Sequence, residues 1–118
     1  MKRDITLYVG DIVDNIDKAV AFIGNCSYEL FSEDEKTAYA VVRCLEIIGE
    51  ASKHIPEELR KRWPDIPWKE MAGMRDKCIH DYIGIDYEVI WTAVKDELPR
   101  IRQMVHSVRD ELRQSEKK

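Results

Sequence analysis

The stretch of the chain richest in reactive side chains runs from residue 74 to residue 82, between Gly73 and Gly84. Its polar side chains are those of Arg75, Asp76, Lys77, His80, Asp81 and Tyr82. Arginine is a permanent cation with several donors for phosphate oxygens, and an unperturbed histidine gives and takes protons near neutral pH. Because these two residue types together suit phosphodiester chemistry, we expect any functional site to include Arg75 and His80.

The reaction that these side chains could perform is metal-independent cleavage of RNA. A base removes the proton of a ribose 2′-hydroxyl, that oxygen attacks the adjacent phosphorus, and a cation stabilises the extra negative charge. We assign His80 as the base or acid and Arg75 as the cation on the scissile phosphate. Asp76, one helical turn before His80, would orient the imidazole, and Tyr82 would donate to the phosphate or the leaving oxygen.

Helix geometry limits how these residues can meet. At about 100° per residue, Arg75 and Tyr82 share one face of a helix, whereas His80 points roughly 140° away from Arg75. One straight helix therefore cannot aim all three at one substrate. Either the helix ends or distorts near His80, helped by Gly84, or a two-fold dimer brings Arg75 and His80 of both copies into one cleft. We favour the dimer.

Apolar residues recur at three- and four-residue steps along nearly the whole chain, which predicts amphipathic helices. We expect helices over residues 4–25, from Ser32 as N-cap to residue 51, from Pro56 to Trp63, from Pro67 to about Tyr82, and from Asp86 onward. No useful stretch alternates apolar and polar residues with period two. The sequence therefore predicts an all-α, up-and-down bundle of four to five helices over residues 1–113, with a kink at Pro99 and a polar tail at 114–118.

The composition is that of one globular domain, with 118 residues, of which 44% are hydrophobic and 36% charged. No apolar run approaches the roughly 18 residues that cross a bilayer, and the N-terminal sequence does not resemble a signal peptide, so we expect a cytoplasmic protein with no membrane contact. The cysteines form no C-x-x-C pair and are odd in number, which favours reduced thiols over disulfides or zinc: Cys26, Cys44 and Cys78. We expect neither a metal nor a cofactor.

The net charge of −4 is unevenly distributed along the chain. Residues 1–50 carry 5 basic and 10 acidic side chains, whereas residues 51–118 carry 14 and 13. A weakly acidic protein does not attract nucleic acid by its overall field, so RNA contact requires a local basic patch in the second half. Its candidates, which as isolated charges are more often solvated, are Arg60, Lys61, Arg62, Arg100, Arg102, Arg109 and Arg113.

Several other residues receive a structural interpretation. The three-residue spacing of acidic side chains in the first helix suggests a solvated face, with electrostatic complementarity to a basic partner as its functional use: Asp11, Asp14 and Asp17. We expect the tryptophans to fill the core or a dimer interface: Trp63, Trp68 and Trp91. His54 and His106 keep structural roles, and Cys78 is expected to pack.

The stretch from Arg75 to Tyr82 has the spacing arginine, four residues, histidine, one residue, tyrosine. Further segments accompany it: Ile66-Pro67-Trp68 and Met71-Ala72-Gly73-Met74 before it, Gly84 through Trp91 after it, and Leu98-Pro99 in the last helix. In these features the sequence resembles the HepT-like toxins of the HEPN-domain ribonuclease family. The resemblance covers nearly the whole chain.

The resemblance implies a HEPN-like fold and a homodimeric, metal-independent endoribonuclease toxin whose catalytic pair is Arg75 and His80. It also implies an antitoxin, an MNT-type nucleotidyltransferase that neutralises the toxin by transferring AMP to Tyr82. The family often has asparagine where Asp76 stands here. Since a carboxylate beside the scissile phosphate adds like-charge repulsion, positioning of His80 suits Asp76 better than contact with RNA.

Two other hypotheses remain open. The first is a non-catalytic helical module of the same fold that grips a nucleotide or a partner protein without cutting RNA. The second is an interaction bundle in which the motif is an ion-paired helix end. Catalysis requires His80 to exchange protons, whereas binding and purely structural roles do not, so His80 discriminates catalysis from the other two hypotheses.

Overall fold

The structure is a computed structural model that describes residues 4–80 and 84–116, and for His80 and Glu116 only the backbone. The long helices are α1 (Ile5–Ile23), α3 (Glu35–Lys53) and α8 (Leu98–Glu116). The short helices are α2 (Tyr28–Ser32), α4 (Glu57–Arg62), α5 (Trp68–Ala72), α6 (Met74–Cys78) and α7 (Tyr87–Thr92). A π-helical turn, η1 (Ala93–Glu97), joins α7 to α8, and strand β1 (Ile79–His80) pairs with β2 (Gly84–Ile85).

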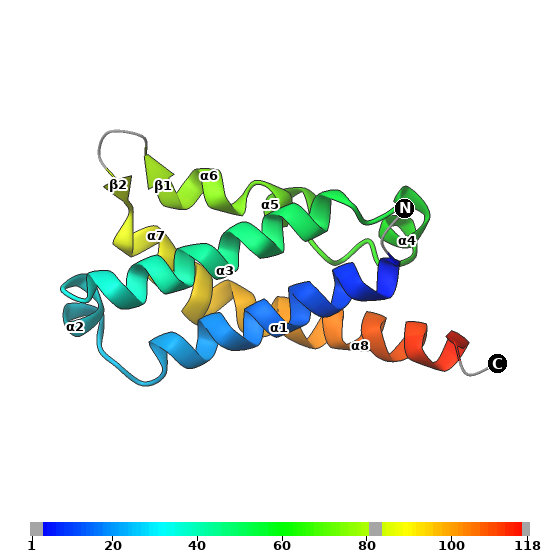
Figure 1. Cartoon of the computed structure of the whole chain (residues 1–118), viewed down its shortest axis with the longest axis horizontal. Helices are drawn as coiled ribbons and strands as arrows, with labels where there is room; N and C mark the ends of the chain where they lie inside the picture. Colours follow the sequence, from blue (N-terminus) through cyan, green and yellow to red (C-terminus); the bar gives the residue numbers. More distant parts are fainter. Residues whose placement is uncertain (1–3, 81–83, 117–118) are drawn as a thin grey trace.

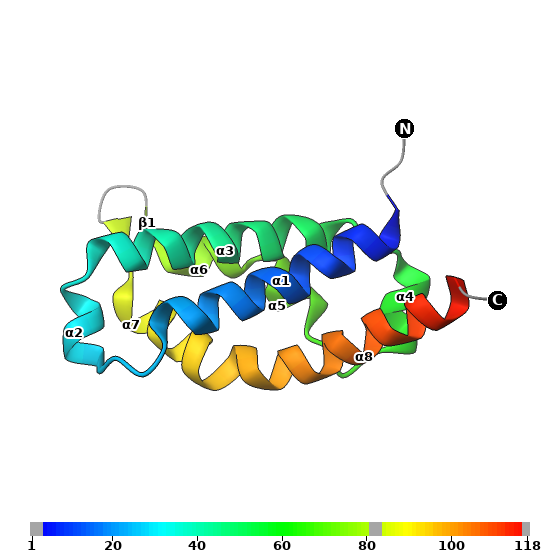
Figure 2. The same cartoon turned by 60° about the horizontal axis from the view of Figure 1, so that its bottom comes forward.

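The helices run up and down along one long axis (Figures 1 and 2). Helix α1 is followed by α3 in the opposite direction, then by α5 and α6 together, and finally by α8. Helix α1 begins and α8 ends at the end of the bundle that holds α4, whereas α2 and the β1–β2 hairpin lie at the other end. This arrangement, with principal extents of 49 × 29 × 26 Å, confirms the predicted all-α bundle.

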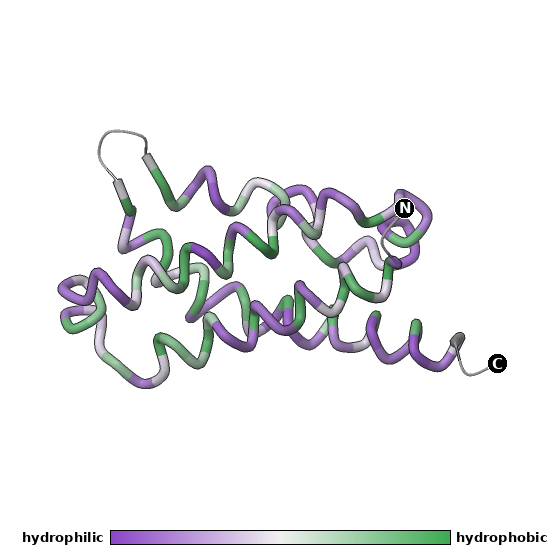
Figure 3. The backbone as a smooth tube through the Cα atoms, viewed as in Figure 1, coloured by the Kyte–Doolittle hydropathy of each residue, from purple (hydrophilic) through white to green (hydrophobic). Residues whose placement is uncertain are grey.

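Apolar side chains of the three long helices meet at the centre of the bundle. The fully buried ones recur at helical spacing: Val9, Ile12, Val13 and Ile16 of α1, Val41, Leu45 and Ile48 of α3, and Leu98, Val105 and Val108 of α8. In Figure 3 the hydrophobic positions of α8 form separate bands between hydrophilic ones, as expected for a helix with one buried face. Each such side chain contributes about 1.5–3 kcal/mol relative to an exposed position.

The second long helix begins at a different residue from the one we predicted. The carboxylate of Asp34 accepts hydrogen bonds from the backbone N–H of Thr37 at 3.0 Å and from its hydroxyl at 2.6 Å. These bonds lower the pKa of Asp34. Ser32 is instead the last residue of α2, and its hydroxyl donates to the Glu29 carbonyl. The prediction of Ser32 as N-cap was wrong because Asp34, an equally good N-cap residue, stands two residues later and accepts two hydrogen bonds from Thr37.

The helix predicted from Pro67 to about Tyr82 is also wrong in its extent. It divides at Gly73 into α5 and α6, and it ends at Cys78. The chain then becomes extended at Ile79 (φ −125°, ψ 126°), a β-branched residue that favours strand geometry. Tyr82 lies outside the described residues.

The last helical run extends from Tyr87 to Glu116 and changes its winding before Pro99. The π-helical turn of residues 93–97 stands immediately before α8, in which Pro99 is the second residue. Proline has no N–H to donate, and its ring crowds the carbonyl four residues earlier, so a wider turn accommodates it. The run changes direction between α7 and α8 (Figure 2), and α8 continues to residue 116, into the expected tail.

Glycine allows two helices to approach closely at one point. A Cβ at Gly49 of α3 would lie 3.1 Å from the Ala72 carbonyl oxygen and 3.2 Å from that of Met71, both in α5. At Gly10 of α1, by contrast, nothing lies within 4 Å of such an atom. Gly49 therefore sets the separation of α3 and α5, whereas Gly10 has no such role.

These two glycines make a matched pair for a stability test. Gly10→Ala should raise the free energy of unfolding by about 0.5–1 kcal/mol, because alanine restricts the unfolded chain without a clash. Gly49→Ala should lower it by about 1–3 kcal/mol, because α5 must move away from α3. Urea denaturation followed by circular dichroism measures both. Equal stabilisation by the two alanines would show that α3 and α5 are not in close contact.

Candidate active site

The backbone between Arg75 and His80 changes from helix to strand. Helix α6 carries Arg75 and ends at Cys78, and the Cys78 carbonyl accepts a hydrogen bond of 2.8 Å from the N–H of Asp86. His80 stands in β1, where it pairs with Gly84 of β2. Of the two arrangements left open by helix geometry, the structure therefore has the helix end near His80. It does not test the dimer.

The hairpin is anchored by apolar contacts and a cap. Ile79 and Ile85 are register partners, and both pack, half-buried, against the core. Gly84 has a positive φ of 90°, which glycine adopts without strain. After β2, the Asp86 carboxylate accepts from the N–H of Val89 at 3.1 Å and begins α7, as predicted. The motif histidine therefore lies on a short hairpin attached at both ends to buried residues.

The guanidinium of Arg75 is held at the surface by a glutamate of α3. Its Nε donates to Glu46 Oε2 at 3.1 Å, and the Arg75 side chain remains 52% exposed. The terminal amino groups of Arg75 make no hydrogen bond within the described part of the chain, since Nη1 lies 3.8 Å from Asp76 Oδ1. Glu46 thus orients the guanidinium while leaving its outer nitrogens available to an anion.

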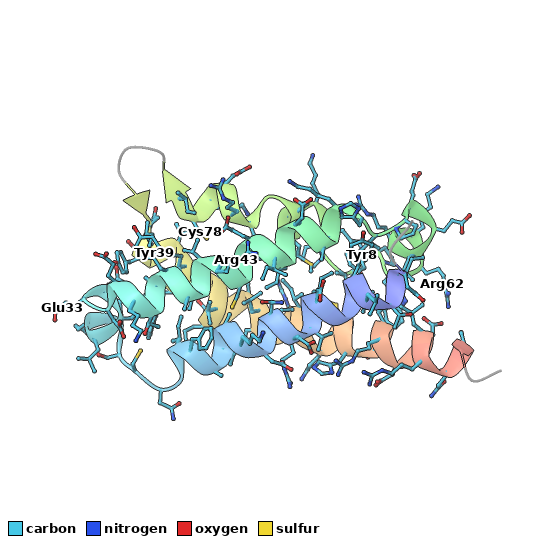
Figure 4. All side chains as sticks on the ribbon, viewed as in Figure 1. Tyr8, Glu33, Tyr39, Arg43, Arg62 and Cys78 are labelled. Atoms are coloured by element: carbon cyan, nitrogen blue, oxygen red, sulfur yellow. The ribbon has the colours of Figure 1, made fainter. Side chains whose placement is uncertain are left out.

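Glu46 is the residue that the sequence interpretation missed. It precedes Arg75 by 29 positions, and no local spacing connects the two. A hollow of about 170 Å³ extends beside it between α1 and α3, lined in part by Tyr8, Arg43 and His54. In Figure 4, Arg43 lies on the face of α3 turned toward the viewer. Only the packing of α6 against α3 brings Glu46 to the motif.

The helix geometry from which we predicted that Asp76 orients the His80 imidazole is not present in the structure. Its carboxylate is 85% exposed and lies beside Arg75. Because the helix ends before His80, the two residues are not one helical turn apart, and orientation of the imidazole by Asp76 stays a prediction. The phosphate contact of Tyr82 also stays a prediction, since that residue lies outside the described part.

The Cys78 thiol is unsuited to nucleophilic chemistry. Burial raises the pKa of Cys78 to about 11, and the nearby carboxylates of Asp86 and Glu97 act in the same direction. Burial also raises the pKa of Cys44. Both cysteines are buried and carry free thiols, so their observed role is packing. Among the side chains that the structure describes, those of His80 and Glu116 not included, no group of three or more histidines, cysteines, aspartates or glutamates is placed to hold a metal ion.

Most of the candidate basic patch is engaged within the molecule. Arg60 donates to the carbonyls of Ser52 and Ile55 at 3.0 Å and so closes the C-terminal end of α3. The other contacts join the following pairs: Arg62 with Glu111, Lys61 with Glu57, Arg102 with Asp17, and Arg109 with Asp14. Two of the acidic residues that we assigned to a partner surface are therefore paired with α8.

The remaining histidines and tryptophans have contacts of a structural kind. His54 stacks on Tyr8 with ring centroids 4.6 Å apart, and His106 lies against Asp17 and Arg109. The tryptophans contact neighbouring elements in three ways: Trp68 is buried and donates to the Trp63 carbonyl, Trp63 donates to Glu111, and Trp91 packs on Phe31. No helix within the described residues has the length and apolar character required to span a membrane.

Comparison with known proteins identifies the class of protein to which this chain belongs. The family described as "Ribonuclease HepT-like" matches residues 12–108. A Methanocaldococcus jannaschii protein named "Putative RNase MJ1216" is 49% identical over 102 residues, covering 86% of this chain and 84% of the relative. "Probable ribonuclease HepT" of Thermococcus cleftensis is 45% identical over 109 residues, covering 92% and 99%. No solved structure matches the chain.

The class that the fold and these relatives define is that of the ribonucleases. The chain belongs to the HepT-like ribonuclease family, and the segment from Arg75 to the hairpin lies within the matched residues.

From the raised pKa of Cys78 we predict that its thiol reacts slowly with alkylating reagents. At pH 8 we expect iodoacetamide to alkylate the half-buried Cys26 long before Cys78, because the Cys78 thiol is both covered and protonated. The unfolded chain loses this proton near the ordinary value of 9.0 and the folded chain near 11. Its contribution to stability is therefore complete below pH 9 and disappears as the pH rises to 11.

Peptide mass spectrometry over a pH series measures the two rates. Modification of Cys78 as fast as Cys26 in folded protein at pH 8 would contradict the burial of this thiol beneath α7.

Proposed function

We propose that this chain is an endoribonuclease that cleaves RNA without a metal ion, with His80 and Arg75 as its catalytic residues. The observation that carries the proposal is the exposed Arg75 guanidinium, held by Glu46 beside the helix end that leads into His80. Family membership supplies the substrate class, since the relatives are named as RNases.

The proposed reaction uses the substrate's own ribose as nucleophile. His80 takes the proton of the 2′-hydroxyl, the 2′-oxygen bonds to phosphorus, and the bond from phosphorus to the 5′-oxygen breaks. The leaving 5′-oxygen takes a proton from solvent water, which gives a 2′,3′-cyclic phosphate and a 5′-hydroxyl end, and the protonated His80 returns its proton to the solvent. Arg75 stabilises the extra charge on the phosphate, and Glu46 keeps its guanidinium oriented during this step.

We further propose that two copies act together as a homodimer. The face of α3 beside α6 supports this, because it presents the 58% exposed Tyr39 one turn before Arg43 (Figure 4). An exposed aromatic ring between charged groups is typical of an interface residue. A second copy on this face would bring two motif segments close together.

The proposed biological setting is a toxin–antitoxin pair. In it a nucleotidyltransferase antitoxin transfers AMP from ATP to the phenolic oxygen of Tyr82, with release of pyrophosphate, and so blocks the enzyme. A bulky anionic group added within the motif would block the site of an RNA phosphate and repel the substrate. Family membership supports this setting, in which Tyr82 is the modified residue.

The cleavage proposal is tested with unmodified protein and total RNA in excess chelator. We expect wild-type protein to leave cyclic phosphate ends, and His80→Ala and Arg75→Ala to lower the rate by at least about 100-fold, the size typical of a lost general base or charge stabiliser. Glu46→Gln should lower it less, because the guanidinium keeps its charge.

His54→Ala and Lys36→Ala are the controls, one histidine and one exposed cation that belong neither to the motif nor to the candidate basic patch, and both should cleave normally. Sedimentation of the same samples gives their oligomeric state. A dimeric, unmodified wild type that leaves RNA intact would instead favour the non-catalytic nucleotide- or partner-binding module.

The modification is tested by intact mass after coexpression with a neighbouring nucleotidyltransferase. We expect an adduct with the mass of AMP on wild-type protein and no adduct on Tyr82→Phe, because phenylalanine lacks the accepting oxygen. The adduct should abolish RNA cleavage. An adduct that persists in Tyr82→Phe would place the modification on another residue.

A further inference from the structure

A pocket of about 190 Å³ lies on the side of α6 away from Glu46, between α5 and α6 on one wall and η1 and α8 on the other. Its floor is apolar, because the lining side chains of Met71, Met74, Cys78, Ala93 and Ile101 are each at most 5% exposed. An apolar cavity of roughly 150 Å³ is known to hold a benzene molecule. The pocket therefore has room for a planar aromatic ring.

The mouth of this pocket carries charges of both signs. Glu70, Lys77, Glu97 and Arg100 line it, all four are exposed, and none forms an ion pair with another described residue. Glu97 at the mouth and Cys78 on the floor line the same pocket. A ligand matching this mouth has an anionic group for the two cations and N–H donors for the carboxylates.

A nucleotide combines these features in one molecule. Its base is a planar ring for the apolar floor, and its phosphate suits Lys77 and Arg100. Adenine, cytosine and guanine also carry an exocyclic amine that donates to a carboxylate, and uracil does not. The pocket therefore fits a nucleotide with an amino-bearing base better than a uridine.

The position of the pocket relates it to the RNA cleavage site. Met74 and Cys78, one turn apart on α6, line it, whereas Arg75 on the same helix bonds to α3 on the other side. The pocket and the Arg75 guanidinium therefore lie on opposite sides of helix α6. The π-helical turn supplies Ala93 and Glu97 to the opposite wall, and such wide turns are frequent at functional sites.

We propose that this pocket is a base-selecting subsite, which takes up an amino-bearing base of the RNA strand as the strand crosses α6 from Arg75. Lys77 and Arg100 hold the phosphate of that nucleotide, and Glu97 accepts from its exocyclic amine. The inference rests on the proposed ribonuclease function and adds to it a source of sequence preference.

Binding of uncleavable RNA tests the subsite separately from catalysis. The probes are fluorescent 2′-O-methyl pentauridylate and its variants with a central adenine, cytosine or guanine, which lack the nucleophilic hydroxyl. By fluorescence anisotropy we expect wild-type protein to bind at least one amino-bearing probe about five-fold or more tightly than the uridine probe. Equal affinities for all four probes would overturn the proposal.

Three variants locate the preference in the pocket. Ala93→Leu fills the floor and should remove the preference, and Glu97→Gln should weaken it without changing uridine binding. Arg100→Ala should weaken every probe and reduce the slope of log affinity against log salt by about 1. Arg113→Ala, an exposed arginine farther along α8, is the control and should keep the full preference.

Each alternative occupant gives a distinct result. If folded Ala93→Leu retains the base preference of the wild type, the proposal is overturned. If Ala93→Leu does not fold, Glu97→Gln takes its place, and an unchanged base preference in that variant overturns the proposal. Saturable binding of AMP, CMP or GMP with no preference among the oligonucleotides would overturn it in favour of a free nucleotide. A changed sedimentation coefficient in Ala93→Leu with unchanged RNA binding would overturn it in favour of a protein contact.

The same samples separate this inference from the proposed function. Base preference without any RNA cleavage would remove the catalytic proposal and leave a nucleotide-binding pocket. Cleavage that depends on His80, with no base preference, would remove only the subsite.

Discussion

The close contact between the backbones of α3 and α5 at Gly49 determines the position of the candidate site. The carbonyl groups of Met71 and Ala72 lie where any side chain at residue 49 would stand. Helix α6 follows after Gly73, so its placement along α3 depends on this contact. The Arg75–Glu46 bond forms on the same pair of surfaces, one turn before Gly49 along α3. The contact at Gly49 and the Arg75–Glu46 bond therefore both join the α5–α6 segment to α3.

Electrostatic pairing within the bundle explains how an acidic chain could contact RNA. The arginines of α4 and α8 are largely engaged with glutamates, aspartates or helix-end carbonyls, so they add little net field at the surface. The positive charge that remains available to RNA is confined to exposed cations on and near α6, next to the end of that helix. Affinity for RNA in such a protein would come from a few well-placed contacts instead of a broad basic face, and its salt dependence would be correspondingly shallow.

The helical periodicity was sufficient to predict the long helices and the all-α class, because apolar stripes of four or five turns have few other interpretations. Asp86 was predicted correctly as the start of a helix, and the first helix, expected over residues 4–25, spans Ile5–Ile23. The cap at Asp34 was missed because Ser32 offered a competing motif two residues earlier. The end of α6 was missed because it depends on Ile79 and Ile85 packing onto a core built by distant segments. Glu46 could not be inferred for the same reason, since its link to Arg75 exists only in three dimensions.

The π-helical turn divides one continuous helix into two segments with different buried faces. A turn of this kind holds an additional residue, and each residue of a helix corresponds to about 100° of rotation about its axis. Before the turn, Ile90 is buried and Trp91 packs on Phe31 of α2, and after it, Leu98 and Ile101 are buried within the bundle, where α8 contacts α1. Removing one residue from 93–97 would restore regular winding and rotate α7 about the axis of α8. The length of this turn therefore sets the angular position of α7, which packs against α2, α3 and α6, relative to α8.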